Sequence, residues 1–210
     1  MKYTLLLSAL SFSASIAMAS DIKLPAPRTA GGKPVFEAVA ARASAPSSAF
    51  PTGKISREEL STILWAASGK NRPGKWTVPF GMGLEPYISI YVAGEDGLYR
   101  YSWEDHSLRQ VSGGDVRAKV SRQSFSASAP YTLIFTSDRT PLKKAGRAQE
   151  HWAKWTHVAV GAMTQQVYLA ADALGIGARY LQSLDADFIR KATNQPDDEE
   201  TISILPIGKR

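Results

Sequence analysis

Two short polar motifs in this chain have residue types that bind anions. Arg42 precedes Ser44 by two positions, and Asn71 precedes Arg72 just after an apolar helical pattern that ends at Gly69. A guanidinium matches a phosphate through two parallel N–H bonds, and a serine hydroxyl can bond a neighbouring oxygen. Asn tolerates a left-handed turn, and Arg72 offers a second anion contact. Each motif is equally compatible with an ordinary surface: an Arg beside a loop Ser, and a helix end capped by Gly69.

A pair of adjacent glutamines interrupts the apolar segment at residues 152–174. Buried amides need hydrogen-bond partners. Gln165 and Gln166 therefore predict a contact, which could be with a neighbouring helix, with a second subunit or with a bound cofactor.

Several other kinds of site lack the residues they need. The chain has no cysteine, which excludes disulfides, thiolate metal sites and a cysteine nucleophile. His106, His151 and His157 show no i,i+4 pairing and no carboxylate at metal-ligand spacing, so we predict no metal site. The sequence contains no G-x-S-x-G, P-loop or G-x-G-x-x-G motif, which argues against three large enzyme classes.

The elements that must position these residues follow from periodicity and turn signals. Ser56 and Glu59 form a capping box for a helix that ends near Gly69. A turn at 94–97 joins two β-rich runs into a hairpin. The longest helix is residues 152–174, and its second half is apolar nearly all round, as is typical of a helix buried in a domain or a dimer. The remaining predicted elements are helices at 35–43, at 116–122 and after Asp185, and strands at 87–92, 98–102, 131–136, 178–181 and 201–207.

The N-terminal 19 residues have the features of a signal peptide. Lys2 supplies a positive start, residues 5–16 an apolar core, and Ala17-Met18-Ala19 a small-residue cleavage site. The apolar run is shorter than the ~20 residues that a membrane-spanning helix needs. We therefore expect cleavage after Ala19, a periplasmic or secreted protein, and no transmembrane segment in the mature chain.

The mature chain is expected to have an arm and one domain. Residues 20–34 are rich in Pro and Gly, which predicts an extended arm that could wrap a partner subunit, and residues 35–210 suffice for one α+β domain. Loss of the leader removes only Lys2 among charged residues, which leaves 24 Lys and Arg against 19 Asp and Glu, a net charge of +5. That charge suits an anionic ligand or an acidic surface, and it is also an ordinary solubility device.

The order of motifs resembles one known family. The stretch LWAASGKNR at 64–72 and the stretch GLYRY at 97–101 are similar to the short members of the FMN-dependent nitroreductase family. The resemblance covers residues 34–210. It implies an α+β fold in which a central mixed or antiparallel sheet is flanked by helices, with a long buried central helix.

The resemblance also implies a cofactor and its contacts. The protein would be an exported oxidoreductase and a homodimer with FMN at the subunit interface, and it would transfer hydride or electrons through the flavin to or from a small-molecule substrate. Arg42 and Ser44 match the family's R-x-S contact with the flavin phosphate and ribityl chain, and no catalytic side chain is implied. The other implied cofactor contacts are Asn71, Arg72, Gln165, Gln182, Ser183 and Lys209.

Two departures from the family pattern favour an alternative. A basic residue common in the family is replaced here by Pro46, and a polar loop that contacts the flavin ring reads PFGMGLE at 79–85. Phe80 or Met82 could pack on a flavin face, and Gly81 and Gly83 could supply main-chain N–H groups. The alternative is a nitroreductase-like fold that has lost flavin and acts as a binding or structural protein.

A basic segment with interleaved aromatics spans residues 143–155. It could contact an anionic lipid surface or nucleic acid. Helical spacing more simply places Trp152 and Trp155 toward the core with the lysines in water. Export also argues against nucleic acid as a partner.

Overall fold

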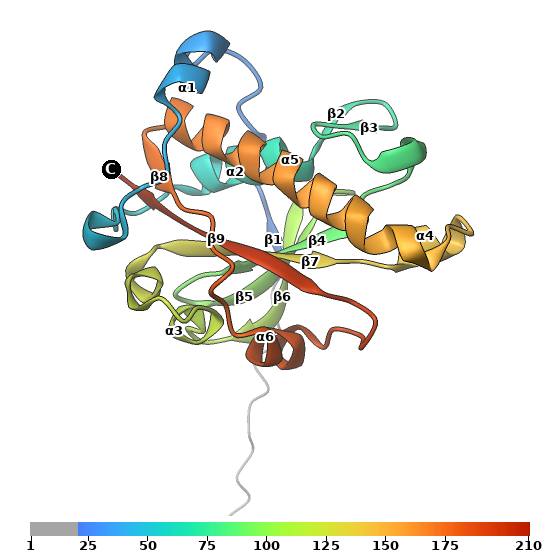
Figure 1. Cartoon of the computed structure of the whole chain (residues 1–210). Coiled ribbons are helices and arrows are strands. Elements are labelled where there is room, and N and C mark those ends of the chain that lie inside the picture. The colour runs from blue at the N-terminus through green and yellow to red at the C-terminus, as the bar shows by residue number, and fades with distance from the viewer. Residues whose placement is uncertain (1–20) are drawn as a thin grey trace, which may run out of the picture.

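A seven-stranded sheet runs through the protein with its strands in the order β1-β6-β5-β4-β7-β9-β8, and each strand is antiparallel to its neighbours (Figure 1). The structure is a computed structural model that describes residues 21–210, so the predicted leader lies outside the described residues. A separate two-stranded ribbon pairs β2 with β3. The strands are β1 Ile22–Lys23, β2 Lys70–Arg72, β3 Lys75–Trp76, β4 Ile88–Ala93, β5 Gly97–Ser102, β6 Ser107–Gly113, β7 Tyr131–Ser137, β8 Ile176–Ala178 and β9 Thr201–Lys209.

Helices cover both faces of the sheet. Figure 1 shows α2 and α5 on one face, with α1 beyond them, and α3 and α6 on the other face. None of the helices within residues 21–210 combines the length and apolar character needed to cross a membrane. The α-helices are α1 Val35–Ala41, α2 Arg57–Ser68, α3 Arg117–Val120, α4 Thr140–Lys144, α5 Trp152–Ala173 and α6 Ala186–Thr193, and short 3-10 turns are Ser47–Ala49, Gly81–Gly83, Ser124–Ser128 and Gln149–His151.

The apolar core is divided by the sheet. Successive side chains of a strand point to opposite faces. Ile90 and Val92 therefore join the larger core with α2 and α5, whereas Tyr91 and Ala93 join the smaller core with α3 and α6. This is the flanked-sheet α+β fold that the sequence predicts.

Most predicted elements are confirmed, and their ends shift by a few residues. The capping box is present, because Ser56 Oγ accepts the Glu59 N–H at 3.2 Å and Glu59 Oε2 accepts the Ser56 N–H at 2.9 Å. The strand predicted at 178–181 is wrong in position, since β8 ends at Ala178. The Tyr180 N–H bonds the Tyr168 hydroxyl at 2.8 Å, so it is not available to a neighbouring strand.

The long helix α5 has a buried and an exposed face. Met163 and Val167 are fully buried against the larger core, but Gly161 and Gln165 are exposed in the single chain. The predicted long helix is therefore confirmed, and within one protomer it is buried on one face only. Burial of its other face in a dimer, the alternative that the sequence left open, stays a prediction.

The N-terminal arm packs along its own chain. Ile22 of β1 pairs with Leu108 of β6, and the Leu24 side chain is buried. Further along, the Arg28 N–H donates to Thr62 Oγ1 on α2 at 3.0 Å. The arm thus adds a short edge strand to the sheet and then crosses toward α2.

A chain of hydrogen bonds holds the arm at Pro25. Tyr101 Oη lies 2.9 Å from His106 Nδ1, His106 Nε2 lies 2.7 Å from Ser61 Oγ, and Ser61 Oγ donates to the Pro25 carbonyl at 2.6 Å. Burial raises the pKa of Tyr101, which therefore keeps its proton and donates it to Nδ1. His106 is thus neutral, with its own proton on Nε2.

Acid is expected to weaken this attachment. Burial is the main cause that lowers the pKa of His106 below 6.5; nearby Lys23 also lowers it, while the Pro25 hydrogen bond and Asp105 raise it. Between the lowered pKa and 6.5 the unfolded chain binds more protons at this site, so the free energy of unfolding should fall as pH drops through that window.

Urea denaturation at a series of pH values measures this dependence. The matched variant is His106→Asn, because His106 has φ of 52° and Asn tolerates a left-handed backbone. We expect part of the pH dependence below 6.5 to disappear in the variant. An unchanged pH dependence would show that His106 does not titrate on unfolding.

Candidate functional site

A cleft of about 470 Å³ lies along the exposed face of α5, and we call it the α5 cleft. Its volume is within the range typical of small-molecule sites. It brings together three residues singled out from the sequence: Ser44 from the segment after α1, Gln165 from α5, and Gln182 from the segment after β8. The full lining is Ser44, His157, Val160, Gly161, Thr164, Gln165, Tyr168, Tyr180, Gln182 and Ile202.

Tyr168 links the three segments that form the cleft. Its hydroxyl accepts the Tyr180 N–H at 2.8 Å and lies 2.8 Å from Ser44 Oγ. Either hydroxyl can donate in this pair, and the Tyr168 proton can be donated to Ser44 because the Tyr180 bond does not use it. The exposed Ser44 hydroxyl can then donate its own proton to a ligand oxygen in the cleft.

Cations gather at the end of the cleft nearest the C-terminus of α5. The Arg42 guanidinium lies over the Tyr168 ring, 5.3 Å from its centroid. One turn further along the same helix face, Asp172 bonds Lys33 at 2.5 Å and Arg210 at 3.4 Å. The hydrogen bond from Lys33 is the main cause that lowers the Asp172 pKa, with Arg210 adding to it. Asp172 offsets part of this charge, and the C-terminal end of a helix dipole is itself negative. Arg42, over the Tyr168 ring, is the cation of this group that contacts a residue of the cleft lining.

Thr164 presents an unused hydroxyl to the cleft. Its Oγ1 is buried and has no hydrogen-bond partner within residues 21–210. A buried hydroxyl without a partner is costly. A molecule in the cleft could bond this atom only if neighbouring side chains moved aside.

The other predicted cofactor contacts do not line this cleft. Asn71 and Arg72 are exposed on β2 and border a separate hollow beside Trp76 and Phe80. The left-handed turn expected at Asn71 is wrong, since Asn71 is in a strand and Gly74 has the positive φ.

Ser183 and Lys209 make contacts within the chain and do not line the cleft. The Ser183 carbonyl accepts the Arg122 N–H at 3.1 Å. The Lys209 ammonium is paired with Glu59 and donates to the Leu174 carbonyl at 2.6 Å. Lys209 therefore ties the last strand to α2 and α5, and Arg210 is the terminal cation on the Asp172 side.

The two glutamines of α5 have different surroundings. Gln166 Nε2 donates to the Thr77 carbonyl at 3.2 Å, so its partner is the segment after β3 within the same chain. Gln165, one position earlier in the chain, lines the α5 cleft and is exposed. Only Gln165 is free to serve a ligand in the single chain.

The altered loop at 79–85 is packed inward. Phe80 is buried, with its ring centroid 5.2 Å from that of Tyr87, and the Gly81 N–H donates to Tyr87 Oη at 3.0 Å. Both groups are thus unavailable to a flavin in this conformation. Of the alternatives that the sequence left open, Phe80 and Gly81 are engaged by Tyr87 in this conformation, whereas contacts by Met82 and Gly83 stay predictions.

Sequence reasoning missed Thr164, Tyr168, Tyr180 and the Asp172 cluster. One signal could have found part of it: Gly161, Gln165, Tyr168 and Asp172 recur at helical spacing, which places them on one face of α5. Within residues 21–210 no three carboxylate or imidazole groups gather as a metal site would require. At the rim of the cleft, His157 lies 3.3 Å from Glu200.

Comparison with known proteins agrees with this architecture. The model of the nitroreductase family matches residues 39–209. A nitroreductase-type protein of Methanocaldococcus jannaschii is 30% identical over 173 residues, which cover 77% of this chain and 84% of that protein. A crystal structure of a nitroreductase-type protein from Ralstonia eutropha is 30% identical, with a TM-score of 0.81, and the match covers 99% of this chain and 95% of that chain.

One enzyme of known name has a similar fold at lower sequence identity. The NADPH:FMN oxidoreductase of Vibrio harveyi, crystallised with NAD+, has a TM-score of 0.57 at 17% identity, over 83% of this chain and 68% of that one. The helix-flanked antiparallel sheet is thus a fold that this chain shares with that enzyme. The chain belongs to the nitroreductase family, and this family supports an oxidoreductase role.

Proposed function

We propose that the protein is an FMN-dependent oxidoreductase that holds its cofactor in the α5 cleft. The observation that carries the proposal is the set of unused polar groups there: the Ser44 proton and the Gln165 amide. The Vibrio harveyi oxidoreductase, which acts on FMN by its name, shares the fold.

The residues present fit such a cofactor in chemical type. Arg42 suits the phosphate, Ser44 and Gln182 suit ribityl hydroxyls, and Gln165 can bond the polar edge of a ring. Bound FMN would supply hydride or electron transfer. The chain's part is to hold the cofactor and to orient the substrate.

We also propose that the active unit is a homodimer. Val35 and Phe36 on α1 are 61% and 86% exposed, and Val158 on α5 is 67% exposed. Large apolar side chains clustered on a surface are typical of an interface. A second subunit on this face would cover the open side of the cleft and could bring Asn71 and Arg72 to the partner's cofactor.

We also propose that the protein is exported, on the basis of the signal-peptide features of residues 1–19. NAD(P)H is not expected outside the cytoplasm, so an exported enzyme needs another electron donor or works in the direction of substrate oxidation. The substrate is proposed only as a small molecule.

One preparation tests these points together. The full-length chain is expressed, and the exported fraction is purified with and without FMN. Its mass should correspond to a chain that begins at Ser20, light scattering should show a dimer, and the absorbance spectrum should show bound flavin. A protein that stays colourless at saturating FMN would instead support a flavin-free binding protein, in keeping with Pro46 and the inward-packed Phe80.

Arg42→Gln should weaken FMN binding by roughly tenfold to a hundredfold, because a charge-assisted bond contributes about 1.5–3 kcal/mol. Fluorescence titration with FMN measures the effect. Arg57→Gln, at the exposed start of α2, is the matched control and should bind as the unmodified protein does. Equal affinities of the two variants would exclude a phosphate contact by Arg42.

A further inference from the structure

The sheet opens between two of its central strands. β4 pairs with β7 over its whole length, from Ile88 to Ala93, but it pairs with β5 only as far as Tyr91↔Arg100. β5 continues beside β6 as far as Ser102. Ile88–Ser89 and Tyr101–Ser102 therefore diverge, and we call the space between them the β4–β5 fork.

The fork leaves a buried main-chain segment without a strand partner on one side. The Asp138 N–H donates to the Tyr87 carbonyl at 2.8 Å, so Tyr87 directs its main-chain groups toward the β7 side. In an antiparallel sheet these directions alternate, so Ile88 directs its N–H and C=O into the fork. Ile88 is only 4% exposed, and no residue of β5 lies opposite it. Buried main-chain groups need partners.

A cavity of about 490 Å³ fills the fork and shares no lining residue with the α5 cleft. This volume is far larger than one water and is comparable to small-molecule sites. Its walls come from the start of β4, the end of β5 and the turn between β7 and α4.

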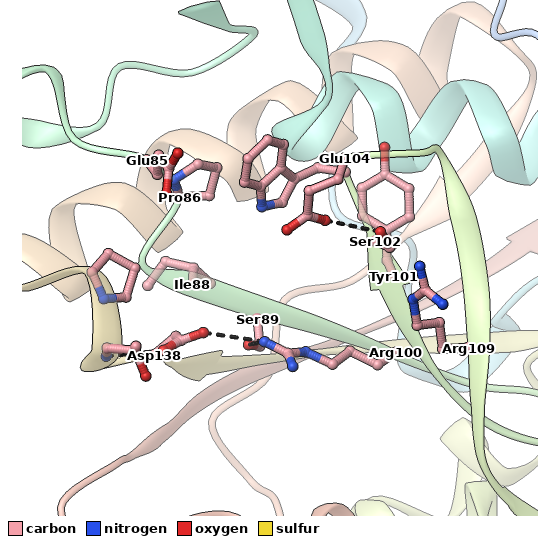
Figure 2. A pocket seen from close by; sticks show the side chains of 13 residues that line it. Glu85, Pro86, Ile88, Ser89, Arg100, Tyr101, Ser102, Glu104, Arg109 and Asp138 are labelled. Carbon is pink, nitrogen blue, oxygen red and sulfur yellow. Dashed lines mark hydrogen bonds and ion pairs between the residues drawn. The ribbon is translucent and has the colours of Figure 1, made fainter. Parts of the chain in front are cut away.

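Five charged side chains line the cavity, and one of them, Arg109, is paired with Asp21 and Asp105. In Figure 2, Arg100 and Asp138 lie on the lower side of the view, and Glu85 and Glu104 on the upper side. Arg100 Nη2 donates to Ser89 Oγ at 2.9 Å and to Asp138 Oδ2 at 3.1 Å, which holds the guanidinium in place. These bonds use only Nη2, and the side chain is half exposed, so Nε and Nη1 remain for a ligand.

The opposite wall suits a cation. Glu104 accepts one bond, from Ser102 Oγ at 2.8 Å, and Glu85 is exposed. Neither carboxylate is in an ion pair within the described chain. Trp103 adds an aromatic surface beside them.

We propose that the β4–β5 fork binds a short peptide with free termini in an extended conformation. The peptide main chain pairs with Ile88 as an added strand does. Its terminal carboxylate bonds Arg100, and its ammonium group lies near Glu85 and Glu104. A peptide fits better than a free amino acid because the main-chain groups of Ile88 and both charged walls then have partners at once. The proposal does not depend on flavin or on the α5 cleft.

Calorimetry and amide NMR of the full mature protein test the proposal with tri-L-alanine as the probe. We expect saturable heat and a shift of the Ile88 amide resonance. N-acetyl-tri-L-alanine amide, which lacks both terminal charges, and L-alanine should each bind at least about tenfold more weakly.

Variants then separate the two charged walls. Arg100→Gln and Glu104→Gln should each weaken tri-L-alanine about tenfold, yet Arg100→Gln should change the affinity of the capped peptide little. Arg122→Gln and Glu95→Gln are exposed controls of the same charge change and should bind normally. The absence of both heat and an Ile88 shift at millimolar peptide would overturn the proposal and would mean that the fork holds only water. Equal affinities for L-alanine and tri-L-alanine would also overturn it. So would normal peptide binding by both the Arg100 and the Glu104 variants.

Discussion

Gly208→Ala is expected to destabilise the protein by ~3 kcal/mol or more, because a side chain there has no space. A Cβ on Gly208 would lie 1.9 Å from the Pro51 carbonyl oxygen and 2.8 Å from its carbonyl carbon. That backbone cannot easily retreat, since Gly53 and Lys209 exchange two hydrogen bonds, of 3.1 and 2.9 Å, just beside it. Either β9 or the segment at 51–53 must move.

The free energy of unfolding in urea measures this effect. Gly113→Ala is the matched control, since Gly113 is also in a strand and its nearest contact would be 3.9 Å away at Gln110 Nε2. It should change stability by less than ~1 kcal/mol. Similar losses for the two variants would show that Pro51 does not pack on β9 as described.

Met163→Ala is expected to lower the free energy of unfolding by ~2–5 kcal/mol. Met163 is fully buried between α5 and the larger core, so truncation leaves a cavity. Gln165, two positions along the same helix, faces the α5 cleft and is exposed. Gln165→Ala should therefore change stability by no more than ~0.5 kcal/mol.

This pair of variants distinguishes the two faces of α5. Thermal unfolding of both variants at low protein concentration, where a dimer would dissociate, is the suitable measurement. If Gln165→Ala cost as much as Met163→Ala, the helix would be buried all round even in one protomer.

Local sequence signals predicted the fold where they were strong. The capping box at Ser56, the 94–97 turn and the N-cap Asp185, whose carboxylate accepts the Phe188 N–H at 2.9 Å, each have a local physical cause. β6 was missed because it is an edge strand in which Arg109, Val111 and Gly113 are exposed, so the apolar alternation is weak. The ribbon β2–β3 was missed because its strands are too short to show a period.

The α5 cleft was predictable only in part, because it is formed by contacts between segments that are far apart in the sequence. Ser44, Gln165 and Gln182 were found through family motifs, and the chain brings them together by contacts between distant segments. Tyr168 provides those contacts, 124 residues from Ser44 and 12 from Tyr180. A tyrosine in an apolar helix is ordinary in sequence, and its two hydrogen bonds are visible only in three dimensions. The fork likewise arises from where strand pairing stops.

The two-residue strand β1 has a consequence for the behaviour of the protein in concentrated solution. It covers β6 only at Ser107 and Leu108, and Val111 on the remaining edge is 38% exposed. An open edge strand is a template for pairing with another chain. The arm that His106 helps to hold therefore also reduces aggregation through this edge. Light scattering of a chain that begins at residue 29 would measure how much aggregation increases when the arm is removed.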